Sequence, residues 1–291
     1  MTVKLGMDRA EFLKRATAGT VGLALATAAP ARKSATTRAV KPNILLIMTD
    51  DQPYHTIGIM ESLHNRVVAR GMRFADGYVA TPICGPARGS VLTGRWSHNA
   101  GLKATDDSWR DLVDSGELAR NIAKRLGAVG YACHLAGKFA NGLSSGKWVC
   151  PGFDSWWAQL EPFNDKDRLY FSKGGAGRLA MPRTGIQAGN ETLVAAQYTE
   201  RFVRGHRDAP WFACFWPHAP HAPYYPLDRY ASTHQGERPP TPFGEPGSNL
   251  TDKAPLVRQN ARFSDAAKTE IMQAYRGQLR EVEEVDDAAN A

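Results

Sequence analysis

One cysteine in this 291-residue sequence stands in a pattern that could do chemistry, Cys84-x-Pro86-x-Arg88. Proline is favoured in the first turn of a helix, where its missing N–H costs nothing, so the pattern predicts a helix that begins beside Cys84. Arg88 follows four residues later and shares a helix face with the cysteine. Helical side chains tilt toward the N-terminus, which brings the guanidinium back toward Cys84. Because free N–H groups and the positive end of the helix dipole face the same spot, we expect a site for an oxyanion with a reactive group at its centre.

Two adjacent acids, Asp50 and Asp51, follow a continuous apolar run over 43–48. Such a run is typical of a strand buried on both faces of a parallel sheet. Open α/β sheets bind their ligands at the carboxyl ends of such strands. Adjacent carboxylates repel one another, and a hard divalent cation with oxygen ligands, Ca²⁺ or Mg²⁺, would relieve that repulsion. A polar turn is the alternative interpretation, and the neighbouring Cys84 pattern favours the metal site.

Three basic residues follow two other predicted strands. Lys138 comes after a glycine at the end of a strand predicted in 130–137 and could bind a negatively charged oxygen. Taken by itself, such a lysine is more often a solvent-exposed surface residue. His218 and His221 stand among prolines directly after the apolar run 211–216. A stiff loop is a poor place for a core histidine and a reasonable one for a catalytic acid.

Taken together, these patterns resemble the sulfatase family, the formylglycine-dependent members of the alkaline phosphatase superfamily. The sulfatase signature is similar to Cys84-x-Pro86-x-Arg88 with its extension Leu-Thr-Gly-Arg over 92–95. The Asp-Asp pair after the first strand, the Gly-Lys element and the Pro-His-x-Pro run are similar to further elements of that family. An asparagine three residues after Lys138, in place of a histidine two residues after it, resembles the N-acetylglucosamine-6-sulfatase branch.

The resemblance implies a reaction and a set of site residues. Cys84 would be oxidised to formylglycine by a formylglycine-generating enzyme, and a hydroxyl of the hydrated aldehyde would attack the sulfur of a sulfated carbohydrate or aryl sulfate. Calcium, or magnesium in its place, would assist this attack. The implied residues are Cys84, Arg88, Lys138 and His218 for catalysis, Lys138, His218, His221 and Asn141 for substrate binding, and Asp50, Asp51 and Cys84 for the metal.

Two other functions stay open. Relatives with the same cysteine motif are phosphonate monoester hydrolases or phosphodiesterases. In the family, a later strand also supplies an Asp-Asn pair to the metal, and this sequence contains no Asp-Asn pair. We therefore expect the chain to be the N-terminal part of a catalytic domain, with slow hydrolysis or none, and an inactive fragment is the second alternative.

Composition excludes some classes of function. The formal charge is +7, but the basic residues are spread along the chain and no nucleic-acid motif occurs, so no nucleic-acid partner is expected. The four cysteines lack zinc spacing. If Cys84 is modified, Cys133, Cys150 and Cys214 can form at most one disulfide, whose pairing the sequence leaves open.

The first 31 residues have the pattern of an export signal, with a basic start and a small-residue apolar run that is too short to span a bilayer. Ala10 stands where a twin-arginine motif has its second arginine, so the route is open between the Tat and Sec systems. Residues 32–40 are expected to be a linker, and 41–291 the sulfatase part. Secretion or periplasmic export, without stable membrane insertion, is the predicted localisation.

Several elements must position these residues. The resemblance implies an alkaline-phosphatase-like three-layer α/β/α fold with a mostly parallel sheet, incomplete at the C-terminus. Patterning predicts buried strands at 43–48 and 211–216 and a strand in 130–137 that contains a structural His134. It predicts helices at 63–70, 118–126, 191–203 and 268–285 and a loop over 231–260. Trp148, Trp156 and Trp157 line a substrate cleft or pack in the core.

Overall fold

The structure is a computed structural model, and it describes residues 41–102, 108–142, 151–159, 170–173, 178–180, 190–240, 251–259 and 263–290. The predictions that concern the export signal, the linker, Trp148 and Cys150 fall outside the described residues.

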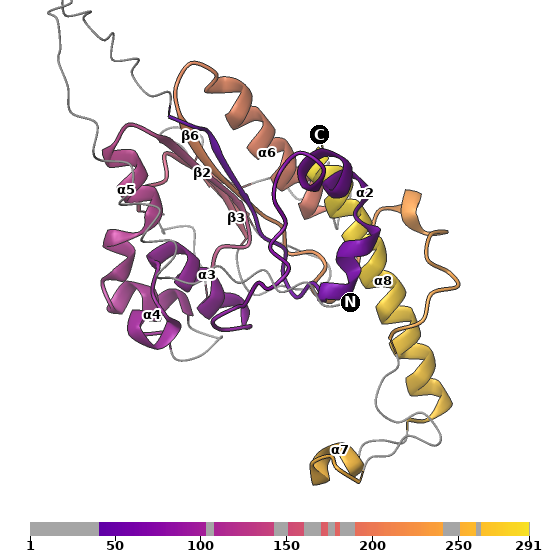
Figure 1. Ribbon diagram of the computed structural model, residues 1–291. Coiled ribbons are helices and arrows are strands. Elements are labelled where there is room, and N and C mark those ends of the chain that lie inside the picture. Colours follow the sequence, from indigo (N-terminus) through magenta and orange to yellow (C-terminus); the bar gives the residue numbers. More distant parts are fainter. Residues whose placement is uncertain are drawn as a thin grey trace, which may run out of the picture. The chain divides into compact units, whose positions relative to one another are not determined.

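A six-stranded sheet in the order β1-β6-β2-β3-β4-β5 forms the middle layer (Figure 1). Its strands are β1 (Ile44–Ile47), β2 (Ala132–Gly137), β3 (Ser155–Gln159), β4 (Tyr170–Lys173), β5 (Arg178–Ala180) and β6 (Trp211–Trp216). The first four strands in this order pair in parallel. β4 then pairs in antiparallel fashion with both β3 and β5. The predicted mostly parallel sheet and the strands at 130–137 and 211–216 are therefore confirmed. The strand predicted at 43–48 also forms, but burial on both of its faces was wrong: β1 lies at an edge of the sheet, where Leu45 is 46% and Ile47 is 36% exposed.

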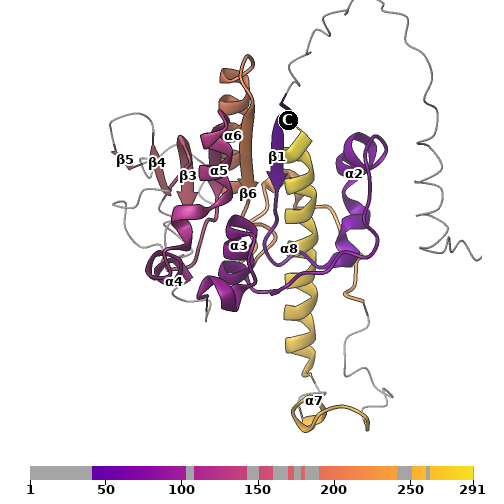
Figure 2. The same ribbon diagram turned by 60° about the vertical axis from the view of Figure 1, so that its left-hand side comes forward.

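Helices cover both faces of this sheet because side chains alternate along each strand. On one face, Cys133 and Leu135 of β2 join a core with helices α3 (Cys84–Thr93), α4 (Ser108–Asp114) and α5 (Ile122–Ala128). On the other face, Ala136 and Phe215 pack with helices α6 (Glu191–Gly205) and α8 (Asp265–Asn290). Figure 1 shows the sheet between α5 on one side and α6 on the other, and Figure 2 shows β1 and β5 at opposite edges of the sheet. This is the three-layer α/β/α arrangement that the sequence predicts.

The remaining helices correct several predicted boundaries. The helix expected at 118–126 is divided into a 3-10 turn, η4 (Glu117–Arg120), and α5, because the Asn121 side chain accepts a hydrogen bond from Lys124 N at 3.0 Å and caps α5. The helix expected at 63–70 begins earlier, as α2 (Glu61–Leu63), and continues as a π-helical turn, η2 (His64–Val68). The region 231–260, predicted as a loop, contains α7 (Pro255–Gln259). Single 3-10 turns are η1 (Tyr54–Ile59), η3 (Ser97–Ala100) and η5 (Asp228–Tyr230).

Neither described tryptophan of the predicted cleft reaches a surface. Trp156 is 3% exposed and Trp157 is fully buried, each packed on an opposite face of β3. Core packing, the alternative interpretation, is correct for both. Cys133 and Cys214 are buried free thiols, and burial raises the pKa of each. None of the described helices is both long enough and apolar enough to cross a bilayer.

His134 makes the stability of the fold sensitive to acid. It is 2% exposed within β2, its Nδ1 lies 2.8 Å from Ser155 Oγ, and its ring stacks on Phe202 with centroids 4.8 Å apart. Burial lowers its pKa to about 3. Between that value and the ordinary pKa, the unfolded chain binds a proton that the folded chain excludes, so the free energy of unfolding falls as the pH falls below about 6.5.

We expect this histidine to remove about 2 kcal/mol of stability between pH 6.5 and 5, from the slope of about 1.4 kcal/mol per pH unit. Urea denaturation at a series of pH values measures the effect. The His134→Gln variant should lack this part of the pH dependence, whereas His98→Gln, at an exposed position, should retain it. Parallel curves for the wild type and His134→Gln would contradict the assignment.

Candidate active site

Three loops meet at one edge of the sheet because β1, β2 and β6 are parallel and end there. Asp50 follows β1, Lys138 follows β2, and the proline-rich loop with two histidines follows β6. Gly137 allows the closest of these approaches. It has φ +111°, and a Cβ there would lie 1.9 Å from Trp216 O, the same carbonyl that accepts a hydrogen bond from Lys138 N at 2.8 Å. Any other residue at 137 would push Lys138 away from β6.

Helix α3 begins at Cys84, as the proline pattern predicts. Ile83 has extended backbone angles, and Ala87 N donates to Ile83 O at 2.8 Å as the helix begins. The next residue, Gly85, leaves room for α4, because a Cβ there would lie 2.1 Å from Ser108 Oγ. The helix ends at Gly94 with φ +68°, a left-handed cap that favours glycine and accounts for the Thr-Gly step of the signature. Local sequence therefore sets both ends of the helix that carries Cys84 and Arg88.

Asp50, Lys138 and Arg88 form a buried ion cluster. Their side chains are at most 4% exposed. Lys138 Nζ contacts Asp50 Oδ2, Arg88 Nη2 lies 3.5 Å from the same oxygen, and Arg88 Nη1 donates to Lys138 O at 2.6 Å. Burial by itself would raise the pKa of Asp50, but the two cations offset it and hold the pKa below its ordinary value. With two cations and one carboxylate, the cluster carries one net positive charge and suits an anionic ligand.

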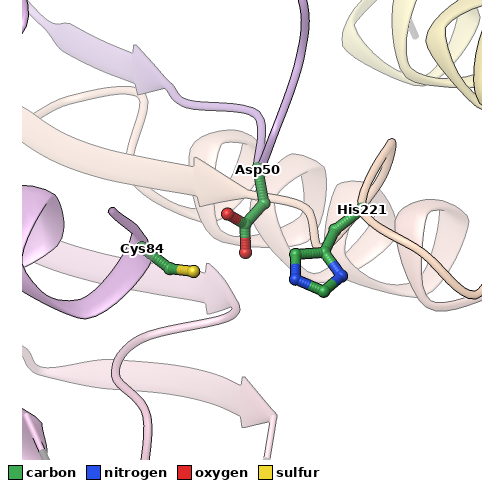
Figure 3. A group of neighbouring side chains, drawn as sticks. All are labelled: Asp50, Cys84 and His221. Atoms are coloured by element: carbon green, nitrogen blue, oxygen red, sulfur yellow. The ribbon is translucent and has the colours of Figure 1, made fainter. Parts of the chain in front are cut away.

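Cys84, Asp50 and His221 converge beside this cluster. One ligand-type atom of each lies within 4.8 Å of the other two, and Figure 3 shows the three side chains directed toward one another. His221 Nδ1 faces the carbonyl oxygen of Ala222, which can only accept, so this nitrogen carries a proton. A hydrogen bond with Cys84 raises the pKa of His221, against the opposing effect of partial burial. This imidazole is therefore placed as a candidate proton donor beside residue 84.

His218 packs against the ring of His221 and is buried. Its ring centroid is 4.5 Å from that of His221, it is 2% exposed, and its Nδ1 lies 3.2 Å from Glu191 Oε1. Burial lowers the pKa of His218, and Glu191 opposes that shift. The family resemblance implies the main role for His218 and a supporting one for His221, whereas the structure sets His221 beside Cys84.

Two other predicted site residues lie next to this group of side chains. Asp51 has φ +53° and a side chain that is 56% exposed, with Oδ2 at 3.4 Å from His221 Nε2. Asn141 supports the start of α3: its backbone N donates to Ser108 Oγ at 3.1 Å, and a Cβ on Gly85 would lie 3.1 Å from its Oδ1. Of the three predicted metal ligands, only Asp50 and Cys84 therefore converge.

The ligand atoms around Cys84 match the requirements of calcium only in part. Calcium takes 6–8 oxygen ligands, whereas Asp50, Cys84 and His221 present a carboxylate, a thiol sulfur and an imidazole nitrogen. Oxidation of Cys84 would replace sulfur by oxygen and so improve the match. Even then, the group formed by Asp50, residue 84 and His221 supplies too few oxygen ligands to complete the coordination shell of calcium.

Two partners in the site lack a sequence signal. Glu191 is the first residue of α6, and nothing in the sequence relates it to His218, which follows 27 residues later in another loop. Trp216 lies under Arg88, with the guanidinium carbon 5.4 Å from the ring centroid. The sequence presents Trp216 only as one member of an apolar strand. Both relations depend on tertiary contacts.

Known proteins that are similar to this chain include sulfatases. The chain is 24% identical to N-acetylglucosamine-6-sulfatase of Homo sapiens over 253 residues, which are 78% of this chain and 44% of that protein. It is 32% identical to the extracellular sulfatase SULF-1 homolog of Drosophila melanogaster over 132 residues, 43% of this chain and 11% of that protein. The chain spans less than half the length of the curated relatives it matches.

Among solved structures, one protein in complex with its substrate D-glucosamine-2-N,6-O-disulfate has a TM-score of 0.60 at 18% identity, over 86% of this chain and 60% of that one. The phosphonate monoester hydrolase of Silicibacter pomeroyi has a TM-score of 0.58 at 19% identity, over 86% and 58%. At such identities these likenesses establish the alkaline-phosphatase-like fold. The family model "Sulfatase" matches residues 42–290. This chain belongs to the sulfatase family.

Proposed function

We propose that this chain carries the nucleophile and the sulfate-binding groups of a sulfuric ester hydrolase. The observation that supports this most is the convergence of Cys84, Asp50 and His221 beside the cations of Arg88 and Lys138. Formylglycine at position 84, as its hydrate, would supply an oxygen nucleophile for the sulfur of the ester. Membership of the sulfatase family supports the same reaction.

Each of the surrounding residues then has a defined task. The guanidinium of Arg88 and the ammonium of Lys138 attract the sulfate monoanion and stabilise the charge that develops on its oxygens. Asp50 holds both cations in place and leaves one positive charge in excess. The start of α3 adds N–H groups and a positive dipole end at residue 84. Asn141 supports that helix start and is assigned no contact with substrate.

We assign the proton donor to His221, with His218 as its support. His221 lies beside residue 84, within reach of the leaving alcohol of an ester attacked there, which suits a proton donor. His218, buried against Glu191, is placed to hold the neighbouring ring. This reverses the order of the two histidines that the sequence favours.

The proposed substrates are sulfated sugars, such as N-acetylglucosamine 6-sulfate units. The name of the human relative and the glucosamine disulfate in the matched structure support this class. Asp50 and an oxidised residue 84 are the ligands that the described residues offer to calcium. Because these are few oxygens, we expect calcium to bind more weakly than the roughly 10⁻⁴–10⁻³ M typical of extracellular calcium modules.

The function is tested with chain produced together with a formylglycine-generating enzyme, supplied with saturating calcium. We expect release of sulfate from an aryl sulfate and from N-acetylglucosamine 6-sulfate, slower than in a complete sulfatase. A phosphonate monoester also carries one negative charge and is the necessary comparison. Faster turnover of the phosphonate would favour the hydrolase alternative. No turnover of any ester, with the aldehyde present, would favour an inactive fragment.

Replacement of His221 by glutamine should lower kcat by about 10²–10⁴-fold for a sugar sulfate, whose alcohol is a poor leaving group that needs a proton. The loss should be much smaller for nitrophenyl sulfate, because nitrophenolate leaves unprotonated. Steady-state kinetics on both esters give the comparison, and His218→Gln provides the matched variant. Equal losses on the two substrates would exclude His221 as the proton donor.

We also propose that residues 1–31 direct export and that 32–40 link them to the family domain. The name of the extracellular Drosophila relative supports an extracellular site of action. Mass spectrometry of chain recovered outside the cytoplasm should show a new N-terminus near Ala29 or Arg32. An exported chain that retains Met1 would contradict this.

A further inference from the structure

The loop that carries both histidines is held at each end by a buried carboxylate. This histidine loop, residues 217–227, follows β6. Near its start, His218 Nδ1 lies 3.2 Å from Glu191 Oε1, on the first residue of α6. At its end, Leu227 N donates to Glu284 Oε2 of α8 at 2.9 Å. Glu191 is 8% exposed and Glu284 is 2% exposed. Two helices therefore reach the same loop through ionisable groups that water barely contacts.

Hydrogen bonds to these carboxylates hold the loop in place more strongly than neutral hydrogen bonds would. Hydrogen bonds to a carboxylate are roughly twice as strong as neutral hydrogen bonds, and a buried carboxylate without its donors is costly. Glu281 of α8 adds a third bond of this kind, accepting from Tyr225 N at 2.6 Å. Glu191 on α6 and both Glu281 and Glu284 on α8 therefore contact this one loop. The loop, α6 and α8 thus share one network.

His221 lies between these two anchors and depends on them for its direction. Its backbone N donates to His218 O at 3.0 Å, and its ring packs on the ring of His218. The other side of the imidazole faces Cys84 and Asp50 (Figure 3). A shift of His218 or of the loop end would therefore move the His221 ring relative to residue 84.

We propose that Glu191 and Glu284 are positioning residues of the active site, which hold the histidine loop at its two ends so that His221 faces residue 84. This inference rests on the proposed role of His221. Glu191 acts through the His218 ring, whose Nδ1 proton it accepts, and Glu284 acts through the backbone of Leu227. Because these carboxylates belong to α6 and α8, the two helices on the far face of the sheet take part in arranging the site.

The test uses the full chain with an unmodified Cys84, labelled with ¹⁵N-histidine, so that it needs no turnover. Long-range ¹H–¹⁵N spectra report which ring nitrogen of each histidine carries the proton, and His218→Asn and His221→Asn assign the two signals. Glu191→Met and Glu284→Met remove the acceptor while keeping a side chain of similar length. Glu200→Met, at a partly exposed position of α6 where the side chain pairs with Arg204 of the same helix, is the matched control.

We expect the His221 signals to shift or broaden in Glu191→Met and in Glu284→Met, to move back toward the wild type in Glu191→Gln, and to stay unchanged in Glu200→Met. Thermal unfolding shows that each variant is folded. Unchanged His221 signals in folded Glu191→Met and Glu284→Met would overturn the proposal. If a methionine variant does not fold, the leucine variant at the same position, which also lacks the acceptor, decides, with unchanged His221 signals again counting against the proposal.

A second readout separates this inference from the proposed function. In matured chain, Glu191→Met should lower kcat by about ten- to a hundredfold, the effect of misplacing a reacting group by about 1 Å, while KM changes little. A chain without sulfatase activity would refute the proposed function and leave the spectra to decide the positioning role. Normal kcat in Glu191→Met, with an active wild type, would overturn the positioning role alone.

Discussion

Replacing Cys84 with alanine should abolish sulfate-ester hydrolysis and leave the chain folded. The side chain is only partly buried, at the first position of α3. Alanine is the best helix former, so a stability change within about 1 kcal/mol is expected. The activity should fall by at least about 10⁴-fold relative to matured wild type, the order seen when a covalent nucleophile is removed. Steady-state assays with an aryl sulfate, together with urea denaturation, measure the two effects separately.

Maturation itself gives the companion measurement. Cys84 alone among the four cysteines stands in a Cys-x-Pro-x-Arg pattern. Peptide mass spectrometry of chain made with a formylglycine-generating enzyme should therefore show the aldehyde at position 84 and at no other cysteine. Cys133→Ala, which alters a buried thiol of β2, should still acquire the aldehyde. An intact Cys84 thiol, under conditions that convert a known sulfatase, would remove the basis of the proposed function.

Replacing Asp50 with asparagine should cost about 3–5 kcal/mol of stability, because it leaves two buried cations without their carboxylate. Arg88 and Lys138 are both at most 2% exposed and share Asp50 Oδ2. Asp51→Asn is a close control: it changes the adjacent residue in the same way, but the Asp51 side chain is 56% exposed. Asparagine also tolerates the φ of +53° at that position. Urea denaturation should show a change within about 0.5 kcal/mol for the control.

A chain that does not fold after Asp50→Asn would itself fit the expected loss, so a second variant is required. Lys138→Met in the Asp50→Asn background removes one of the two uncompensated cations and should restore part of the stability. A similar, small effect of Asp50→Asn and Asp51→Asn would mean that the cluster contributes little. Further destabilisation by Lys138→Met would mean that the lysine stabilises the fold through contacts other than Asp50.

Several features of the fold follow from local sequence. The apolar run at 211–216 predicts a strand buried on both faces, because such burial needs apolar side chains at every position. The similar run at 43–48 predicts the strand but not its place at the edge of the sheet, where one of its faces is exposed. The proline and glycine of the signature predict the start and end of α3, since each acts on backbone angles within a few residues. The broken helix at 118–126 was missed because apolar spacing continues across Asn121, whose capping bond interrupts the helix.

The residue types of the candidate site can be predicted from the sequence alone: Cys84 in its signature, acids after the first strand, and a lysine and two histidines after the others, which together indicate the family. Which of these side chains contact one another depends on the tertiary structure. The sequence presents Asp50 and Asp51 as an equivalent pair, but Asp50 is buried against Arg88 and Lys138, while the partly exposed Asp51 contacts only the edge of the group, at His221. His221 meets Cys84, whereas His218 meets Glu191. The reason is physical: side-chain direction in a loop depends on which distant charges the fold brings near, and spacing along the chain does not carry that information.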